Sequence, residues 1–228
     1  MVVMDFQRAR SEEQRDQRRR AILDAATAML GEMSVSSLSL NELSRRVGLA
    51  KSNVMRYFES REDVLLELLS ARLYEWIQAI DLTRVEIDVA PLARTEAIAQ
   101  VLANSLADRP VLCDLISARA AVLERNVSTD AVLRHKRSVN ASVGILAVAL
   151  QQCLPELDDN DIQQAIATTV LMTSGAWPED QPTEAMLAAY EADPAIGEHR
   201  LSFRVFLQQV IATSLAGLMA QRSVAMRH

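Results

Sequence analysis

The segment SLNELSRRVGLAKSNVMRYF, residues 39–58, has the apolar spacing of two short helices joined by a tight turn. Gly48 stands between the two halves and permits the sharp bend that such a turn needs. We therefore predict a helix-turn-helix, in which the apolar residues fix the angle between the helices. These apolar residues are Leu40, Leu43 and Val47 in the first helix and Val54 and Phe58 in the second.

The second helix of this pair presents polar and cationic side chains on the face opposite to its apolar residues. Cations suit DNA phosphates, and short hydrogen-bonding side chains suit base edges in a major groove. From the pattern alone, an ordinary helical hairpin with a solvated polar face fits equally well. The outward residues are Lys51, Ser52, Asn53, Met55, Arg56 and Tyr57.

Apolar residues recur at helical spacing along the whole chain, without a sustained strand-like alternation. We therefore predict an all-α fold with three parts: a polar, flexible arm at residues 1–14, a three-helix helix-turn-helix domain at 15–60, and a larger helical domain at 61–228. Ser39 and Ser60 are each followed three residues later by an acidic residue, which predicts capping boxes. The expected helices cover about residues 13–30, 40–47, 51–58, 61–79, 92–107, 110 onward, 129–154, 159–177, 184–192 and 200–220.

Composition bounds the class of protein. Half of the 228 residues are hydrophobic, which suffices for a core without disulfides or metals. Cys113 and Cys153 lack zinc-site spacing and are expected to be buried and reduced. The first residues do not resemble a signal peptide, and no apolar run has the length of a membrane span, so we expect a cytoplasmic protein.

The net charge of −6 is unevenly distributed along the chain. Residues 1–72 hold 12 basic and 11 acidic residues, whereas residues 73–228 hold 12 basic and 19 acidic residues. Any DNA-facing surface is therefore expected in the first third. Arg18, Arg19 and Arg20 form a basic run there, which either extends toward a minor groove or is simply solvated.

From about Arg18 to Leu69 the sequence resembles the DNA-binding domain of the tetracycline-repressor (TetR) family. The resemblance implies a homodimeric DNA-binding regulator, usually a repressor, whose larger C-terminal domain binds a small molecule. The matching positions are Ser39, Gly48-Leu49, Lys51-Ser-Asn-Val54, Tyr57-Phe58, Ser60-Arg61-Glu62 and Val64-Leu65-Leu66.

The resemblance also implies roles for single residues. Lys51, Ser52 and Asn53 would face base edges, while phosphates would be bound by Arg56, Tyr57, Arg61 and, at the preceding helix start, Ser39. Two positions depart from the family pattern. Met55 stands where the family often has a tyrosine that reaches a phosphate. Ala50 replaces a frequent serine cap, at a local cost of about 1 kcal/mol.

The family dimerises through its last two large helices, which places the expected dimer interface on two apolar stripes of this chain. The alternative is that these stripes form only the core of one subunit. The stripe residues are Ile166, Thr169, Val170 and Thr173, then Phe203, Leu207, Val210, Ile211 and Leu215.

The sequence gives less information about the effector pocket than about the DNA-binding domain or the dimer interface. Trp76 lies on the long helix that links both domains, so a ligand that moves it can move the DNA-binding part. His135 is the polar member of an apolar stripe, although its neighbours in Arg134-His-Lys-Arg137 favour exposure. The remaining candidates are Cys113, Ser117 and Met172.

Two other function classes compete with the regulator. An enzyme is disfavoured, because the three histidines are scattered and neither a phosphate-binding glycine loop nor a catalytic triad or carboxylate pair occurs. We expect no metal and no cofactor. A helical protein-interaction module that has lost DNA binding is favoured by Ala50 and Met55 and disfavoured by Lys51, Arg56 and Arg61.

Overall fold

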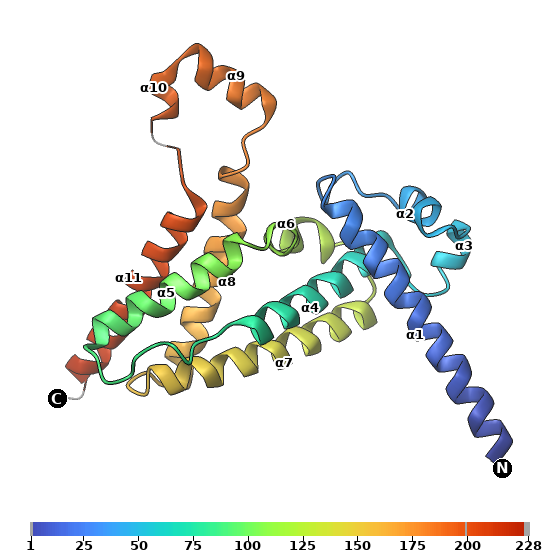
Figure 1. Ribbon diagram of the computed structural model, residues 1–228, viewed down its shortest axis with the longest axis horizontal. Coiled ribbons are helices and arrows are strands. Elements are labelled where there is room, and N and C mark those ends of the chain that lie inside the picture. Colours follow the sequence, from blue (N-terminus) through green and yellow to red (C-terminus); the bar gives the residue numbers. More distant parts are fainter. Residues whose placement is uncertain (1, 199, 226–228) are drawn as a thin grey trace. The chain divides into compact units, whose positions relative to one another are not determined.

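The computed structural model describes the backbone of residues 2–198 and 200–225 and the side chains of residues 13–198 and 200–224. Within these residues all regular structure is helical (Figure 1) and no strand occurs, so the all-α prediction is confirmed. The chain forms two compact units. Unit 1 holds the described residues up to Ala71 together with Ala118–Lys136, and unit 2 holds Arg72–Ser117 and the described residues from Arg137 onward.

Unit 1 contains the helix-turn-helix. Its core is made by residues that are almost completely buried: Ile22, Met29, Leu43, Val54, Phe58, Leu65 and Leu66. Its elements are α1 (Val2–Leu30), α2 (Leu40–Val47), α3 (Lys51–Val54), the first part of α4 (Arg61–Ala79), the single π-helical turn η1 (Arg119–Leu123) and the first part of α7 (Thr129–Cys153).

The two short helices begin and end as their sequence dictates. Ser39 has extended backbone angles and accepts a hydrogen bond from the Glu42 amide at 3.2 Å, which is half of the predicted capping box. Gly48 ends α2 with φ of 71°, a left-handed conformation that favours glycine. Ala50 has no side chain to cap α3, so the expected absence of that cap is confirmed.

The N-terminal segment differs from the predicted arm. The α1 backbone is helical from Val2, eleven residues before the expected start at residue 13. Residues 2–12 contain neither Gly nor Pro, the residues that most disfavour a helix. Once a packed helix exists downstream, each further turn adds hydrogen bonds without a new nucleation cost. The helix can therefore continue to Val2 beyond the residues that pack in the core of unit 1.

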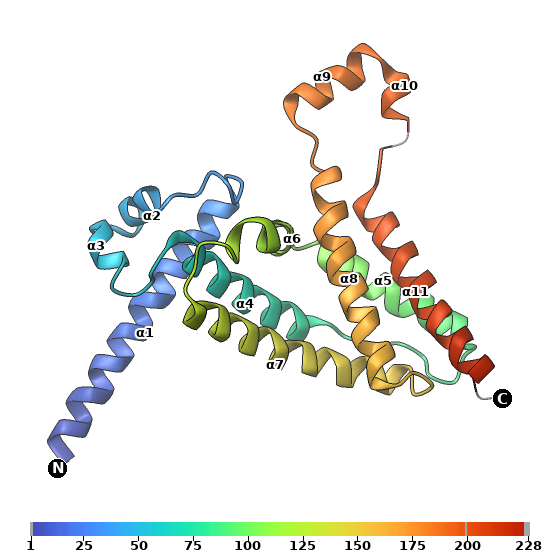
Figure 2. The same cartoon turned by 180° about the vertical axis from the view of Figure 1, so that it is seen from behind.

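Unit 2 is built around α11, which packs against α5 and α8. Figures 1 and 2 show this packing, and both show α9 and α10 standing beyond the ends of α8 and α11. The segment Phe203–Val224 is long and apolar enough to cross a membrane by composition, but α11 also supplies core residues of this unit. The helices that belong wholly or mainly to unit 2 are α5 (Pro91–Ala107), α6 (Pro110–Ala118), α7 from Arg137 onward, α8 (Asp159–Glu179), α9 (Glu184–Ala192), α10 (Pro194–Gly197) and α11 (Phe203–Ala225).

Three chain crossings connect the units: one within α4, one at the end of α6 and one within α7. Two helices are therefore continuous from one unit into the other. The division differs from the predicted one at residue 60, because unit 1 also takes the first half of α4 and the separate segment Ala118–Lys136.

Candidate nucleic-acid interface

The outward face of α3 is exposed in the way its spacing predicts. Lys51, Ser52 and Asn53 are exposed, while Val54 is completely buried on the opposite side. Because α3 has four residues and begins immediately after the turn, all three polar side chains lie in its first turn. Short hydrogen-bonding groups and a cation are thus presented together on a rigidly held element.

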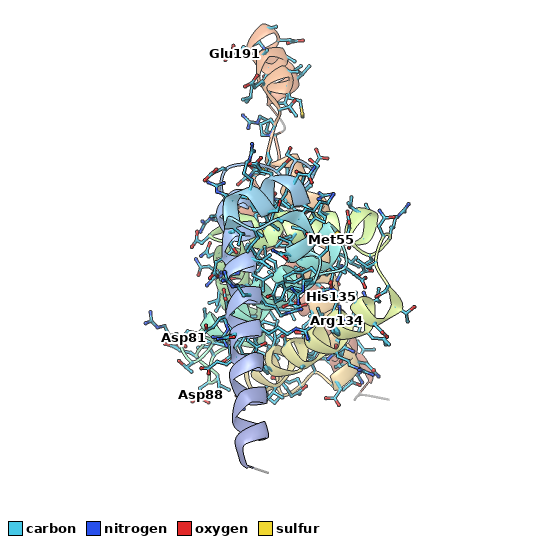
Figure 3. All side chains as sticks on the ribbon, turned by 90° about the vertical axis from the view of Figure 1, so that its right-hand side faces the viewer. Met55, Asp81, Asp88, Arg134, His135 and Glu191 are labelled. Atoms are coloured by element: carbon cyan, nitrogen blue, oxygen red, sulfur yellow. The ribbon has the colours of Figure 1, made fainter. Side chains whose placement is uncertain are left out.

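The residues after α3 continue the same surface. Two amides, those of Tyr57 and Phe58, donate to the Val54 carbonyl at 2.9 and 3.2 Å, so the chain stays tightly turned beyond the helix. Arg56 is exposed and Tyr57 is half-buried. Met55, labelled in Figure 3, is 49% exposed and places an apolar side chain within this polar surface.

Arg19 fastens α1 to this turn. Its guanidinium donates to the Tyr57 carbonyl at 2.6 Å, lies 4.5 Å from the centroid of the Phe58 ring and forms an ion pair with Glu67 of α4. One side chain therefore links three elements through a hydrogen bond, a cation–π contact and a charge pair. The position of α1 beside the α3 surface is fixed by this link.

Several arginines of the helix-turn-helix already have partners within the chain. Arg45 pairs with Glu42, and Arg46 makes two hydrogen bonds of 2.8 and 2.6 Å to the carboxylate of Glu32. The Glu32 carboxylate has a lowered pKa because it accepts these bonds. These arginines are available to DNA only if they give up a carboxylate.

Arg61, predicted to bind a phosphate, is similarly engaged. It is half-buried, it donates to the Val35 carbonyl, and its other terminal nitrogen lies 3.2 Å from Glu62. A phosphate contact by Arg61 would require it to release these partners. Its role remains a prediction, with a structural role already visible.

A small hollow of about 190 Å³ lies beside the α3 surface and includes one residue that the motif did not single out. Arg18 of α1 shares this hollow with Asn53, Arg56 and Tyr57. The available sequence signal was the basic run at Arg18–Arg20, which could not show which arginine faces α3. The structure separates Arg18, beside the surface, from Arg19, which is bound to the core.

Two contacts hold the start of α4 to the start of α7 within unit 1. Arg134 lies 3.1 Å from Asp63, and the Ser128 amide donates to Glu59 at 2.6 Å. The hydroxyl of Ser128 also accepts from the Ala131 amide at 3.2 Å. The start of α7 is therefore capped by Ser128 and tied to the segment that follows the helix-turn-helix.

His135, a predicted effector contact, is buried, contrary to the exposure that its charged neighbours favoured. Its Nδ1 lies 2.8 Å from the Ser70 hydroxyl, which itself donates to the Leu66 carbonyl at 2.9 Å. Ser70 therefore accepts from Nδ1–H, and Nε2 is left as a buried acceptor without a hydrogen-bond partner. Burial lowers the pKa of His135, Lys136 acts in the same direction, and Glu124 opposes them.

The other predicted effector contacts lie in unit 2. The Trp76 indole donates to Ser105 at 2.9 Å, and the Ser117 hydroxyl donates to the Cys113 carbonyl at 2.9 Å. Burial raises the pKa of the Cys113 thiol to about 12, so this group is an unreactive thiol. Met172 is exposed. A pocket that joins these residues remains a prediction.

Most of the predicted dimer residues are occupied within one chain. Seven of the nine are buried in unit 2, and Phe203 packs edge-to-face on Trp177 with ring centroids 5.0 Å apart. A buried side chain has no surface to lose in a dimer, so the stripe is subunit core at these positions. The two half-exposed members are Val170 and Val210. The buried seven are Ile166, Thr169, Thr173, Phe203, Leu207, Ile211 and Leu215.

Two family models match this chain. Residues 22–68 match bacterial regulatory proteins of the tetR family, and residues 69–222 match a tetracyclin repressor-like C-terminal domain. Among curated proteins, an HTH-type transcriptional repressor of Mycobacterium tuberculosis and an HTH-type transcriptional regulator of Mycobacterium bovis are each 26% identical over 119 residues. That match covers 52% of this chain and 44% of each relative, so less than half of the length of these relatives is spanned.

Solved structures share the fold over most of the chain. A TetR transcriptional regulator from Rhodococcus sp. RHA1 has a TM-score of 0.58 at 13% identity and covers 89% of this chain and 97% of that one. The fatty acid degradation regulator FadR from Bacillus halodurans has a TM-score of 0.55 at 16% identity and covers 87% and 98%. At these identities the likeness concerns the fold alone.

Proposed function

Because this chain belongs to the TetR family of transcriptional regulators, we propose that it is a cytoplasmic repressor that binds a palindromic operator as a homodimer and is released by a small molecule. The observation that carries the proposal is the exposed polar start of α3, with Lys51, Ser52 and Asn53 opposite the buried Val54. A repressor needs no catalytic residues, and we propose none.

Sequence reading is assigned to α3. Asn53 has both a donor and an acceptor on its side chain and suits an adenine edge, and Lys51 suits guanine acceptors. Arg56 is exposed immediately after the helix and suits a phosphate that positions α3 in the groove. Met55 offers a methyl-sized apolar contact, as a thymine methyl group would require.

A homodimer supplies the second half-site. One four-residue helix reaches only a few base pairs, and a two-fold dimer with recognition helices about 34–36 Å apart reads a palindrome. Since the inner stripes of α8 and α11 are core, we assign the interface to their outer faces. On α8 this face carries Ala167, Leu171 and Gly175, and on α11 it carries Val205, Thr213 and Gly217.

The connectivity of the units supports the proposed release by an effector. Both α4 and α7 run from unit 1 into unit 2, so a change in unit 2 that shifts either helix also shifts unit 1. An effector that binds more tightly to a dimer with wrongly spaced α3 helices removes the protein from DNA. The proposed effector contacts remain Trp76, Cys113, Ser117, His135 and Met172.

The first experiment is fluorescence anisotropy with a duplex selected from a random-sequence pool by the wild-type protein, with a scrambled duplex as control. We expect binding that weakens steeply with salt and a preference for the selected sequence that is abolished in Asn53→Ala. Arg45→Gln, which removes an exposed, carboxylate-paired charge, is the matched control and should retain the preference. If the selection enriches no sequence, the protein-interaction module, favoured by Ala50 and Met55, replaces the repressor.

A further inference from the structure

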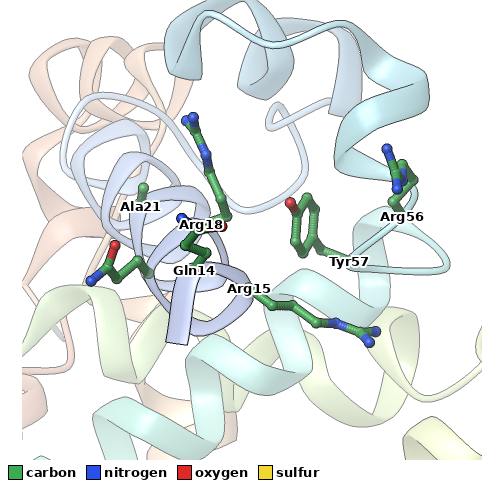
Figure 4. A pocket seen from close by; sticks show the side chains of 7 residues that line it. Gln14, Arg15, Arg18, Ala21, Arg56 and Tyr57 are labelled. Carbon is green, nitrogen blue, oxygen red and sulfur yellow. The ribbon is translucent and has the colours of Figure 1, made fainter. Parts of the chain in front are cut away.

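A second, larger hollow of about 810 Å³ is lined by α1 and by the segment that follows α3 in unit 1. Figure 4 shows Arg15 and Arg18 of α1 and Arg56 and Tyr57 from the segment after α3 around it, with the Tyr57 ring between the two elements. Its volume is several times that of a phosphate group. Gln14 and Gln17 add amide groups to the α1 side.

The lining carries three guanidinium groups and no carboxylate. Glu13 and Asp16, the acidic residues on this stretch of α1, are not part of the lining. Among the side chains that the structure describes, Arg15, Arg18 and Arg56 form no ion pair. Like charges around one hollow create a positive potential that favours an anion, and guanidinium forks match phosphate oxygens.

The helix spacing explains why these α1 residues act together. Positions 14, 17, 18 and 21 are related by three- and four-residue spacings, and Arg15 lies three residues before Arg18, so these residues share a face on which Ala21 leaves room for the hollow. Arg19, one position along, is turned to the core and holds α1 against the Tyr57 carbonyl and the Phe58 ring. The contacts of Arg19 therefore hold α1 in place beside the hollow, and Arg19 itself is not needed to bind an anion there.

The α1 part of this hollow precedes the residues matched by the family model. The match to the tetR family model begins at residue 22, so Arg15 and Arg18 precede it. Both lie in the part of α1, from residue 13, that the sequence predicted to be helical.

We propose that Arg15 and Arg18 of α1, together with Arg56, form a second DNA contact that binds a backbone phosphate beside the bases read by α3. The proposal rests on the proposed DNA-binding function and extends the footprint of each subunit beyond the helix-turn-helix. Its effect is on affinity for any DNA sequence, because phosphates carry no sequence information.

The test is the salt dependence of binding to two duplexes, the selected one and a scrambled one, by fluorescence anisotropy. Arg15→Gln with Arg18→Gln should weaken binding to both duplexes on the order of 10- to 100-fold at 0.1 M salt. The slope of log K against log salt should fall by about 1.8 for each arginine–phosphate pair that the substitutions remove, since a dimer forms each such pair twice. Arg20→Gln, an exposed arginine of the same helix outside the hollow, should leave the slope unchanged.

Four further results test the proposal. When Arg18 is replaced by lysine instead of glutamine, part of the salt slope that the double variant loses should return. Lysine has the charge of arginine but not the paired donors of its guanidinium group. If the double variant has the same slope as Arg20→Gln while wild-type protein still prefers the selected duplex, the phosphate contact is refuted and the repressor function stands. If wild-type protein shows no salt-dependent DNA binding, the repressor function itself fails. Calorimetric titration with pyrophosphate addresses a free anion: pyrophosphate binding that disappears in the double variant while the DNA slope is unchanged would overturn the DNA assignment.

Discussion

The α3 surface in unit 1 and the α8–α11 pair in unit 2 use their apolar residues for the same purpose and leave different faces free. In α3 a single buried residue, Val54, anchors the helix, and the polar residues around it are exposed. In α8 and α11 a long apolar stripe is buried within the subunit, and the outer face contains small and aliphatic residues such as Leu171 and Val205. A stripe of apolar residues thus marks the side that is buried, and the function that we propose for each region is assigned to the side that remains exposed.

The largest expected effect tests the inner side of that pair. Phe203→Ala should lower the free energy of unfolding by about 3–5 kcal/mol, because a ring that is 1% exposed and packed edge-to-face on Trp177 leaves a cavity. Urea unfolding at two protein concentrations measures this decrease. We expect a decrease of similar size at both concentrations. If Phe203→Ala unfolds like the wild type but forms a weaker dimer, Phe203 belongs to the dimer interface, and the assignment of this stripe to the subunit core is wrong.

The outer side of the pair is tested by Leu171→Glu. Leu171 is 61% exposed, so the substitution should leave the folded subunit intact. In a two-fold interface it would bury a like-charged group from each subunit, which should raise the dimer dissociation constant on the order of 100-fold. Sedimentation equilibrium measures the change. Gln181→Glu, at an exposed position beyond α8, is the matched charge control; a wild-type dimer constant for Leu171→Glu would exclude this face.

The sequence determined unit 1 more completely than unit 2, for physical reasons. Ser39, Gly48 and Val54 occupy positions where a cap, a left-handed turn and a buried anchor are each required locally, so the turn and its exposed face follow from residue types. The side toward which α1 presents Arg18 rather than Arg19 depends on a long-range contact to Glu67. Spacing alone cannot supply such a contact.

In unit 2 the missing information is the identity of the packing partner. The stripe through Phe203 and Leu207 was predicted as a dimer interface, with subunit core as the alternative, because an apolar stripe is the same whether its partner is α5 of the same chain or a second subunit. His135 shows the converse error. Its charged neighbours favoured exposure, yet the adjacent residues point elsewhere on the helix while His135 itself meets Ser70. Burial of a polar residue depends on such a partner.

A smaller, stabilising effect is expected at the start of α3. Ala50 has the extended backbone angles of an N-cap, φ of −64° and ψ of 146°, but no side-chain oxygen. Ala50→Ser should therefore add a hydrogen bond to a free amide of α3 and raise the free energy of unfolding by about 1 kcal/mol. Urea unfolding measures the gain, with Ala50→Val as a control that adds volume without a cap. Equal results for Ser and Val would show that the missing cap does not limit this helix.

The smallest expected effect concerns the ion pairs that join the end of α11 to the start of α8. Arg222 donates to Asp158 and Asp161, the two residues of the α8 capping box, and these bonds lower the pKa of the Asp161 carboxyl. A carboxyl with a lowered pKa in the folded state stabilises the fold above its ordinary pKa and loses that contribution as the pH falls through the lowered value.

Arg222→Gln removes the cause of the lowered pKa of Asp161. The melting temperature of the wild type should therefore exceed that of Arg222→Gln by a few degrees at most near pH 7, because the pair is partly solvated, and the difference should shrink below about pH 4. Thermal unfolding between pH 3 and pH 7 measures this difference, and Arg204→Gln, which removes an exposed pairing of α11 with Asp108, serves as the control for removal of a surface arginine. A wild-type advantage that persists unchanged at pH 3 would mean that Arg222 acts by packing its aliphatic stem rather than by its charge.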